Sequence, residues 1–234
     1  MDKAPSFGPT VVLVHGAWAD GSSWRLVIPY LLERGIPVLS VQNPTTSLAE
    51  DVAATRRTLA AIDGPVVLAG HSWGGAVITE AGRDPKVKAL VYVAAFAPGA
   101  GESVGDEVGG HAAPPALSKI IDSGDGFLKL SEEGWISDVA QDLAEKDARL
   151  LSILQTPLSK STFGDKITEA AWEARPSWYI VSTEDRAVSV ELQRSLAARM
   201  KANTTELKAS HMSLLSMPEA VAAVIVDAVN ATRP

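Results

Sequence analysis

The sequence contains no cysteine, which excludes disulfides, thiolate nucleophiles and zinc–thiolate sites. It also has no hydrophobic run of the roughly 20 residues that a membrane-spanning helix needs. The apolar run before His15 has only four residues, too few for the core of a signal peptide. We therefore expect a cytoplasmic protein with no membrane partner.

Runs of like charge are absent as well. The chain carries 21 basic and 28 acidic residues, a net charge of −7, and this balance argues against nucleic acid as a partner. Its 234 residues, 46% of them apolar, suit one α/β domain. The expected partner is a small-molecule substrate, with no metal or cofactor, bound by a monomer or homodimer.

Six short segments rich in β-branched residues are expected to form strands. Most are apolar throughout, as in strands buried on both faces of a parallel sheet. They cover residues 10–15, 37–42, 65–70, 87–95, 177–182 and 204–209. The amphipathic segments between them predict helices over 22–34, 47–62, 74–83, 188–200 and 217–230. This alternation predicts an α/β fold, with a mostly parallel, doubly wound sheet of about six strands and helices on both faces.

Two local signals support the predicted helix starts. Ser47, with Glu50 three residues later, resembles a capping box, and Pro218 lies where a first helical turn tolerates proline. Residues 98–168 interrupt the alternation with glycine- and proline-containing stretches, followed by helical patterns such as residues 137–154. So long a connection indicates a functional insertion or lid. Residues 1–97 and 169–234 would then form the core.

A possible nucleophile lies in "GHSWG", residues 70–74, which matches the pattern G-x-S-x-G. A predicted strand precedes it and a predicted helix follows. Gly70 and Gly74 would leave room for a tight turn at Ser72, while Gly75 would let the helix approach the sheet. By itself the short pattern also fits an ordinary turn that happens to contain serine.

A nucleophilic serine needs a general base, normally a histidine. The chain has four histidines. His71 adjoins the serine and is expected to point elsewhere, His15 ends the first strand, and His111 lies in the insertion. His211 follows the last strand, and loops after parallel strands share one edge of the sheet. His211 is therefore the candidate base.

The histidine in turn needs a carboxylate, which should also follow a strand. Asp185 lies just past the fifth strand, and the order Ser72, Asp185, His211 is that of the α/β-hydrolase triad. The oxyanion would be bound by two backbone N–H groups. Trp73 supplies the first, and Ala17 in "HGAW" is the candidate for the second, with His15 as a structural residue of that turn. The alternative carboxylates are Glu184, Glu102 and Asp106.

Four stretches together resemble the α/β-hydrolase superfamily: "VVLVHGAWADGSSW", "GPVVLAGHSWGGAVITEAG", "STEDRAVSVELQ" and "ASHMSLLSMPEAV". They are most similar to the branch that holds plant methyl-ester esterases, hydroxynitrile lyases and small bacterial esterase-like proteins. In that branch the acid precedes a glutamine by eight residues, as Asp185 precedes Gln193. The lyases have a lysine and a threonine where this chain has Met212 and Gly16, so the resemblance favours ester hydrolysis.

The resemblance further implies that residues 98–168 form a helical cap over Ser72. Its apolar residues Phe127, Leu130, Trp135 and Phe163 are candidates for the substrate pocket, together with Gly16, Trp18 and Met212. Few basic residues lie near the motifs, so the expected substrate is a small neutral ester, apolar or aromatic in part. Lactone or C–C bond hydrolysis, cofactor-free peroxidation and non-catalytic ligand binding on the same scaffold are the alternatives.

Overall fold

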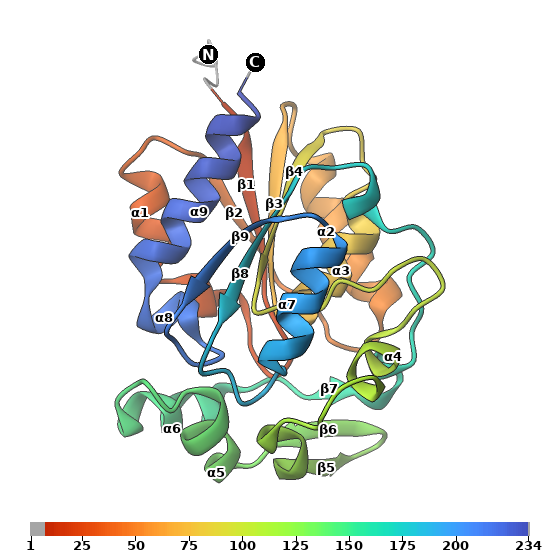
Figure 1. Ribbon diagram of the computed structural model, residues 1–234, viewed down its shortest axis with the longest axis vertical. Helices are drawn as coiled ribbons and strands as arrows, with labels where there is room; N and C mark the ends of the chain where they lie inside the picture. Colours follow the sequence, from red (N-terminus) through yellow and green to blue (C-terminus); the bar gives the residue numbers. More distant parts are fainter. Residues whose placement is uncertain (1–7, 234) are drawn as a thin grey trace.

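Six parallel strands form the central sheet of the computed structural model, which describes residues 8–233 (Figure 1). Residues 1–7 and 234 of the expected core lie outside the described residues. The strand order β2-β1-β3-β4-β8-β9 is that of a doubly wound sheet. The strands are β1 (Thr10–Val14), β2 (Val38–Val41), β3 (Val66–His71), β4 (Val87–Val93), β8 (Ser177–Ser182) and β9 (Asn203–Leu207). All six predicted strands are thus confirmed.

The two faces of the sheet support separate hydrophobic clusters, because successive strand residues point to opposite faces. In β1, Val12 and Val14 face one cluster, while Val11 and Leu13 face the other, and all four are fully buried. This double burial explains why the central strands are apolar throughout.

Helices cover both faces (Figure 1). One face carries α2 (Leu48–Ala60), α3 (Trp73–Ala81) and α7 (Val190–Arg199). The other carries α1 (Ile28–Leu32), α8 (Ser213–Ser216) and α9 (Pro218–Ala231). Among residues 8–233 no helix is long and apolar enough to cross a membrane.

The predicted helices match α2, α3, α7 and α9, with one exception at residues 22–34. That segment divides into a 3₁₀ turn, Gly21–Trp24, and the short α1. Pro29 lies in the first turn of α1, where its missing N–H prevents a continuous helix through this point. The Ser47 hydroxyl accepts from the Glu50 N–H as expected of an N-cap, and Pro218 begins α9.

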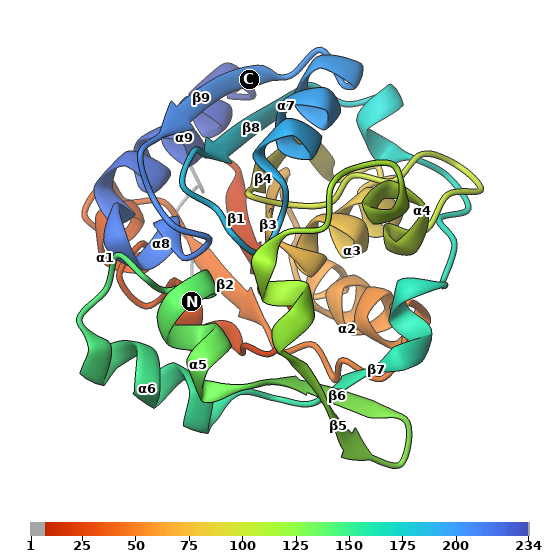
Figure 2. The ribbon, with the colours of Figure 1, turned by 60° about the horizontal axis from the view of Figure 1, so that its bottom comes forward.

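The insertion, residues 98–168, lies across the carboxyl ends of the strands (Figures 1 and 2). It is only partly helical, because β5 (Ile120–Gly124), β6 (Phe127–Leu130) and β7 (Leu158–Ser159) form a second, antiparallel sheet. The hairpin turns through Gly124, Asp125 and Gly126, all of which have positive φ. The other elements of this segment are 3₁₀ turns at Pro115–Lys119 and Lys160–Phe163, α4 (Val104–Gly109), α5 (Glu132–Gly134), a π-helical turn at Trp135–Val139 and α6 (Glu145–Leu154).

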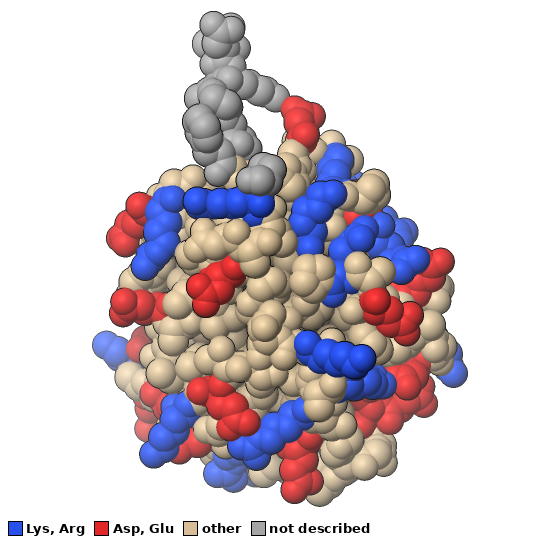
Figure 3. Space-filling view, turned by 45° about the horizontal axis from the view of Figure 1, so that its top comes forward, with Lys and Arg blue, Asp and Glu red and all other residues tan. Residues whose placement is uncertain are grey.

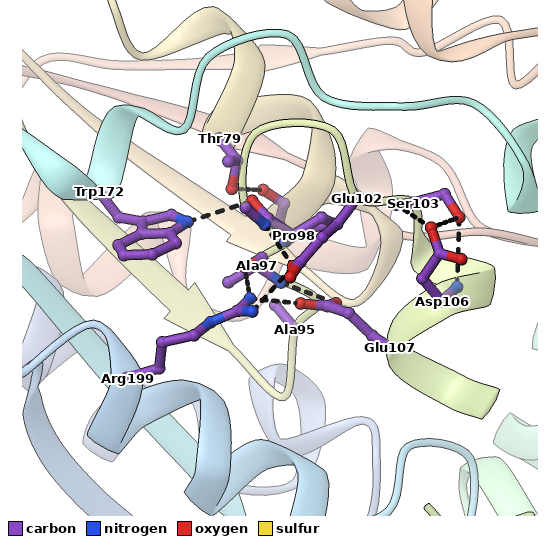
Figure 4. A network of polar contacts seen from close by, with 12 residues as sticks. Thr79, Ala95, Ala97, Pro98, Glu102, Ser103, Asp106, Glu107, Trp172 and Arg199 are labelled. Atoms are coloured by element: carbon purple, nitrogen blue, oxygen red, sulfur yellow. Dashed lines mark hydrogen bonds and ion pairs between the residues drawn. The ribbon is translucent and has the colours of Figure 1, made fainter. Parts of the chain in front are cut away.

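Arg199 at the end of α7 fastens α4 to the core (Figure 4). Its guanidinium donates to Glu107 on α4 at 2.9 Å and to Glu102 at 2.8 Å. It also lies 5.3 Å from the centre of the Trp172 ring, in a cation–π arrangement. Burial raises the pKa of Glu107 to about 8, and the Arg199 charge opposes this rise. The network therefore holds α4, which belongs to the insertion, against the core.

Charged side chains of both signs are interspersed on the face at the amino ends of the strands (Figures 1 and 3). That face lies opposite the insertion (Figure 1). The mixture agrees with the absence of charge runs in the sequence.

Candidate active site

Ser72 occupies the sharp turn between β3 and α3. Its backbone adopts φ 52° and ψ −122°, a sparsely populated conformation that persists only where the surroundings impose it. Two backbone hydrogen bonds do so: the Ser72 N–H donates to the Val93 carbonyl at 3.1 Å, and the Phe96 N–H donates to the Ser72 carbonyl at 3.2 Å. Strain of this kind at a strand-to-helix serine is typical of a nucleophile elbow.

The glycines around Ser72 permit this turn. A Cβ at Gly70 would lie 2.5 Å from the Gly74 carbonyl oxygen, and one at Gly74 would lie 2.5 Å from the Val14 carbonyl oxygen. Only glycine allows backbone segments to approach so closely. The glycines predicted to leave room for the turn therefore do so.

Asp185 and His211 meet across the loops that follow β8 and β9. The Asp185 Oδ2 accepts from the His211 Nδ1 at 2.7 Å and from the Gln193 Nε2 at 2.8 Å. Its Oδ1 accepts from the backbone N–H groups of Ala187 at 2.7 Å and Val188 at 2.9 Å. Four donors thus hold the carboxylate, and the carboxylate orients the imidazole.

The alternative carboxylates lie elsewhere. Glu184 faces Lys208 on the surface at 3.7 Å, while Asp106 accepts from Ser103 in the cap of α4. Glu102 pairs with Arg199, which also binds Glu107. Of the four candidates, only Asp185 contacts His211.

His71 lies against His211, although the sequence pattern led us to expect it to point elsewhere. The two ring centres are 4.6 Å apart, and the His71 Nε2 donates to the His211 carbonyl at 2.9 Å. Burial lowers the pKa of His71 well below its usual value, so its ring is neutral. His71 therefore supports the loop that carries His211. In the sequence, only the position of His71 directly before Ser72 could have pointed to this role.

One cavity brings Ser72 and His211 together beneath the insertion. Ala17, Trp73 and Met212 also line it, as do three of the aromatic residues proposed for the pocket: Trp18, Trp135 and Phe163. Among the described residues, no Asp, Glu, Lys or Arg belongs to its lining. The cavity is therefore apolar apart from a few hydroxyl and imidazole groups.

Three of the residues proposed for the pocket lie outside this lining. Gly16 packs against Ser72, and a Cβ at Gly16 would be 2.8 Å from the serine Cβ. Phe127 begins β6 beside the hairpin turn, and Leu130 packs in the core at the other end of that strand. The sequence did not reveal this hairpin, so it could not place the side chains of β6.

The proposed oxyanion donors belong to Ala17 and Trp73, which line the same cavity as Ser72. Trp73 is the first residue of α3, so its N–H has no acceptor within the helix. Ala17 follows His15, whose ring is tied to the backbone: its Nδ1 donates to the Gly16 carbonyl at 2.8 Å, and its Nε2 accepts from the Asn43 N–H at 2.9 Å. His15 is therefore a structural residue, as expected.

The arrangement can be compared with known proteins. The chain is 27% identical to "Probable hydrolase R7" of Phoma sp., over 94% of this chain and 97% of that one. A pyrethroid hydrolase from Sphingobium faniae superposes with a TM-score of 0.80 at 25% identity, over 96% of this chain and 98% of the other. Polyneuridine aldehyde esterase shares the fold with a TM-score of 0.82 at 22% identity, over 94% and 98%. The model of the "Alpha/beta hydrolase family" matches residues 11–224, and the chain therefore belongs to that family.

Proposed function

We propose that this protein is a serine carboxylester hydrolase with Ser72 as nucleophile, His211 as general base and Asp185 as the residue that orients the histidine. The observation that carries the proposal is the shared cavity, which is lined by a strained serine and by a histidine whose Nδ1 is held by a buried carboxylate. Membership of a hydrolase family supports the same conclusion.

In the proposed reaction, the Ser72 Oγ attacks the ester carbonyl while its proton passes to the His211 Nε2. The oxyanion accepts hydrogen bonds from the backbone N–H groups of Ala17 and Trp73, each worth on the order of 3 kcal/mol of transition-state stabilisation. The C–O bond to the alcohol then breaks, and His211 protonates the departing oxygen. Water, deprotonated by His211, attacks the acyl-enzyme. The bond from the acyl carbon to the Ser72 Oγ then breaks, His211 returns the proton to that oxygen, and the acid leaves.

The cavity lining favours a neutral substrate with apolar acyl and alcohol parts. No charged side chain among the described residues reaches the lining, so an ionised ester would lose its hydration without a partner. Trp18 from the core and Trp135 and Phe163 from the insertion supply flat apolar walls. We infer that residues 98–168 act as the cap that completes this pocket. The similarity to a pyrethroid hydrolase agrees with a hydrophobic ester.

Covalent labelling tests the proposal directly. A fluorophosphonate should add once per chain and should be located on Ser72 by mass spectrometry, with labelling and ester hydrolysis lost in Ser72→Ala. Ser189→Ala is the matched control, because Ser189 lines the same cavity but caps α7. Label on another residue, or undiminished hydrolysis by Ser72→Ala, would refute the mechanism. Assays with esters, lactones and vinylogous diketones separate ester hydrolysis from the alternative reactions.

A further inference from the structure

The Trp73 side chain is anchored by a buried carboxylate that the proposed reaction does not use. The indole Nε1 donates to the Asp51 Oδ2 at 2.7 Å, and the other Asp51 oxygen accepts the Thr45 N–H at 2.7 Å. Asp51 is completely buried, and Trp73 is 3% exposed. One carboxylate on α2 therefore joins the first residue of α3 to the loop after β2.

The same loop also holds the segment of the other proposed oxyanion donor. The Asn43 N–H donates to the His15 Nε2 at 2.9 Å, and the Asn43 side-chain amide donates to the His15 carbonyl at 3.2 Å. His15 lies two residues before Ala17. The loop after β2 is thus linked to both donor segments: Asn43 bonds His15 directly, and Thr45 bonds Asp51 on α2, which in turn accepts from the Trp73 indole.

The backbone of this loop is strained where it meets Asp51. Thr45 has φ 58°, a left-handed conformation that is unfavourable for a β-branched residue. Besides its N–H bond to Asp51, its hydroxyl donates to the Pro157 carbonyl at 2.7 Å, and its carbonyl accepts from the Ser159 N–H at 2.9 Å. These bonds to the insertion and to α2 together impose the strained conformation.

We infer that Asp51 is a positioning residue for the oxyanion hole. Its carboxylate holds the Trp73 peptide in place through the indole, and it holds the loop after β2 through the Thr45 N–H. This inference rests on the proposed function. Burying a carboxylate is costly unless hydrogen bonds compensate for the lost hydration, and apolar packing would hold α2 against α3 without that cost. A carboxylate is suited to this place because its two oxygens accept N–H groups from two separate segments.

Two conservative substitutions test the inference. Trp73→Phe keeps an aromatic ring and the backbone N–H but removes the indole donor. Asp51→Asn keeps the size of the side chain, yet its amide NH₂ must face either the indole or the Thr45 N–H, both of which are donors. The matched control is Tyr92→Phe, which removes a buried hydrogen bond of 2.9 Å to Thr79, elsewhere on α3.

The measurements are kcat and KM for p-nitrophenyl butyrate, the inhibition constant of a trifluoromethyl ketone that forms an oxyanion on the enzyme, and the melting temperature. We expect both variants to lower kcat by roughly 10- to 100-fold with KM within about twofold. The ketone should bind more weakly in proportion to the loss in kcat. Both substitutions break the hydrogen bond between Asp51 and the Trp73 indole, so the kcat of the double variant should be no lower than that of the slower single variant. Tyr92→Phe should lower the melting temperature while kcat stays within about twofold.

Values of kcat within twofold of the control would overturn the inference, as would a change confined to KM or to the melting temperature. If Asp51→Asn does not fold, the kcat of Trp73→Phe alone decides between these outcomes. The proposed function is tested separately in the wild-type background by Ser72→Ala. Loss of hydrolysis in Ser72→Ala together with full kcat in both variants would reject this inference alone.

Discussion

Asp185→Asn is expected to abolish most activity by changing the tautomer of His211. Four donors surround the Asp185 carboxylate: His211 and Gln193 at Oδ2, Ala187 and Val188 at Oδ1. An asparagine would keep its oxygen toward the two backbone N–H groups, because these cannot rotate away. Its NH₂ would then donate to the His211 Nδ1 and leave the proton on Nε2, where it prevents abstraction of the serine proton.

The expected loss follows from that geometry. A histidine held in the wrong tautomer costs about 10⁴-fold in kcat, or about 5.5 kcal/mol of transition-state stabilisation. The Gln193 amide would also face the new NH₂, and one unsatisfied buried donor costs about 1–3 kcal/mol of stability. Hydrolysis of p-nitrophenyl butyrate and urea unfolding measure the two effects separately.

Glu184→Gln is the control for Asp185→Asn, since Glu184 is the adjacent carboxylate and faces Lys208 on the surface. Its kcat should stay within about twofold of wild type. If Asp185→Asn retained kcat within tenfold of wild type, or if Glu184→Gln lost as much as Asp185→Asn, the assigned role of Asp185 would be wrong.

Three further predictions concern stability. Gly75→Ala would place a Cβ 2.1 Å from the Phe96 carbonyl oxygen, so it should lower the free energy of unfolding, measured in urea, by about 3 kcal/mol or more. A loss below about 0.5 kcal/mol would contradict the close approach. The Tyr179 hydroxyl donates to the Ala95 carbonyl at 2.5 Å and accepts the Ala95 N–H at 3.1 Å. Tyr179→Phe removes both bonds and should lower the free energy of unfolding by about 1–3 kcal/mol in the same assay. An unchanged free energy of unfolding would argue against these buried hydrogen bonds. Burial raises the pKa of Asp51 from 3.8 to about 6, so its contribution to stability is present at low pH and lost as pH rises through 6. Wild type should therefore lose roughly 2 kcal/mol relative to Asp51→Asn between pH 4 and 7.5. Parallel stability curves would refute the shift.

The central sheet could be predicted because its signals are local. β-Branched runs such as that of β1 are buried on both faces, and their apolar character does not depend on which neighbours they meet. The turn at Ser72 was also predictable, since it needs small residues at fixed offsets along one short segment. Helix starts at Ser47 and Pro218 followed from capping chemistry for the same reason.

The insertion was less predictable. Its hairpin depends on three consecutive residues with positive φ, only two of them glycine, and its third strand, β7, joins from about 30 residues away. Such pairing depends on which chain segments come together in the fold. Phe127 and Leu130 were therefore grouped with the pocket residues, although only the register of β6 decides which way each side chain points.

The sequence alone determined the alternating α/β order, the elbow with its serine, and a carboxylate and a histidine that follow successive strands, because each depends on residues adjacent along the chain. The tertiary structure decided which polar groups meet. It placed Asp185 against His211 in preference to Glu184, brought His71 beside His211, and joined Asp51 to Trp73 across 22 positions. Hydrogen bonds form over about 3 Å and depend on direction, so the packing of the sheet, helices and loops selects the partners.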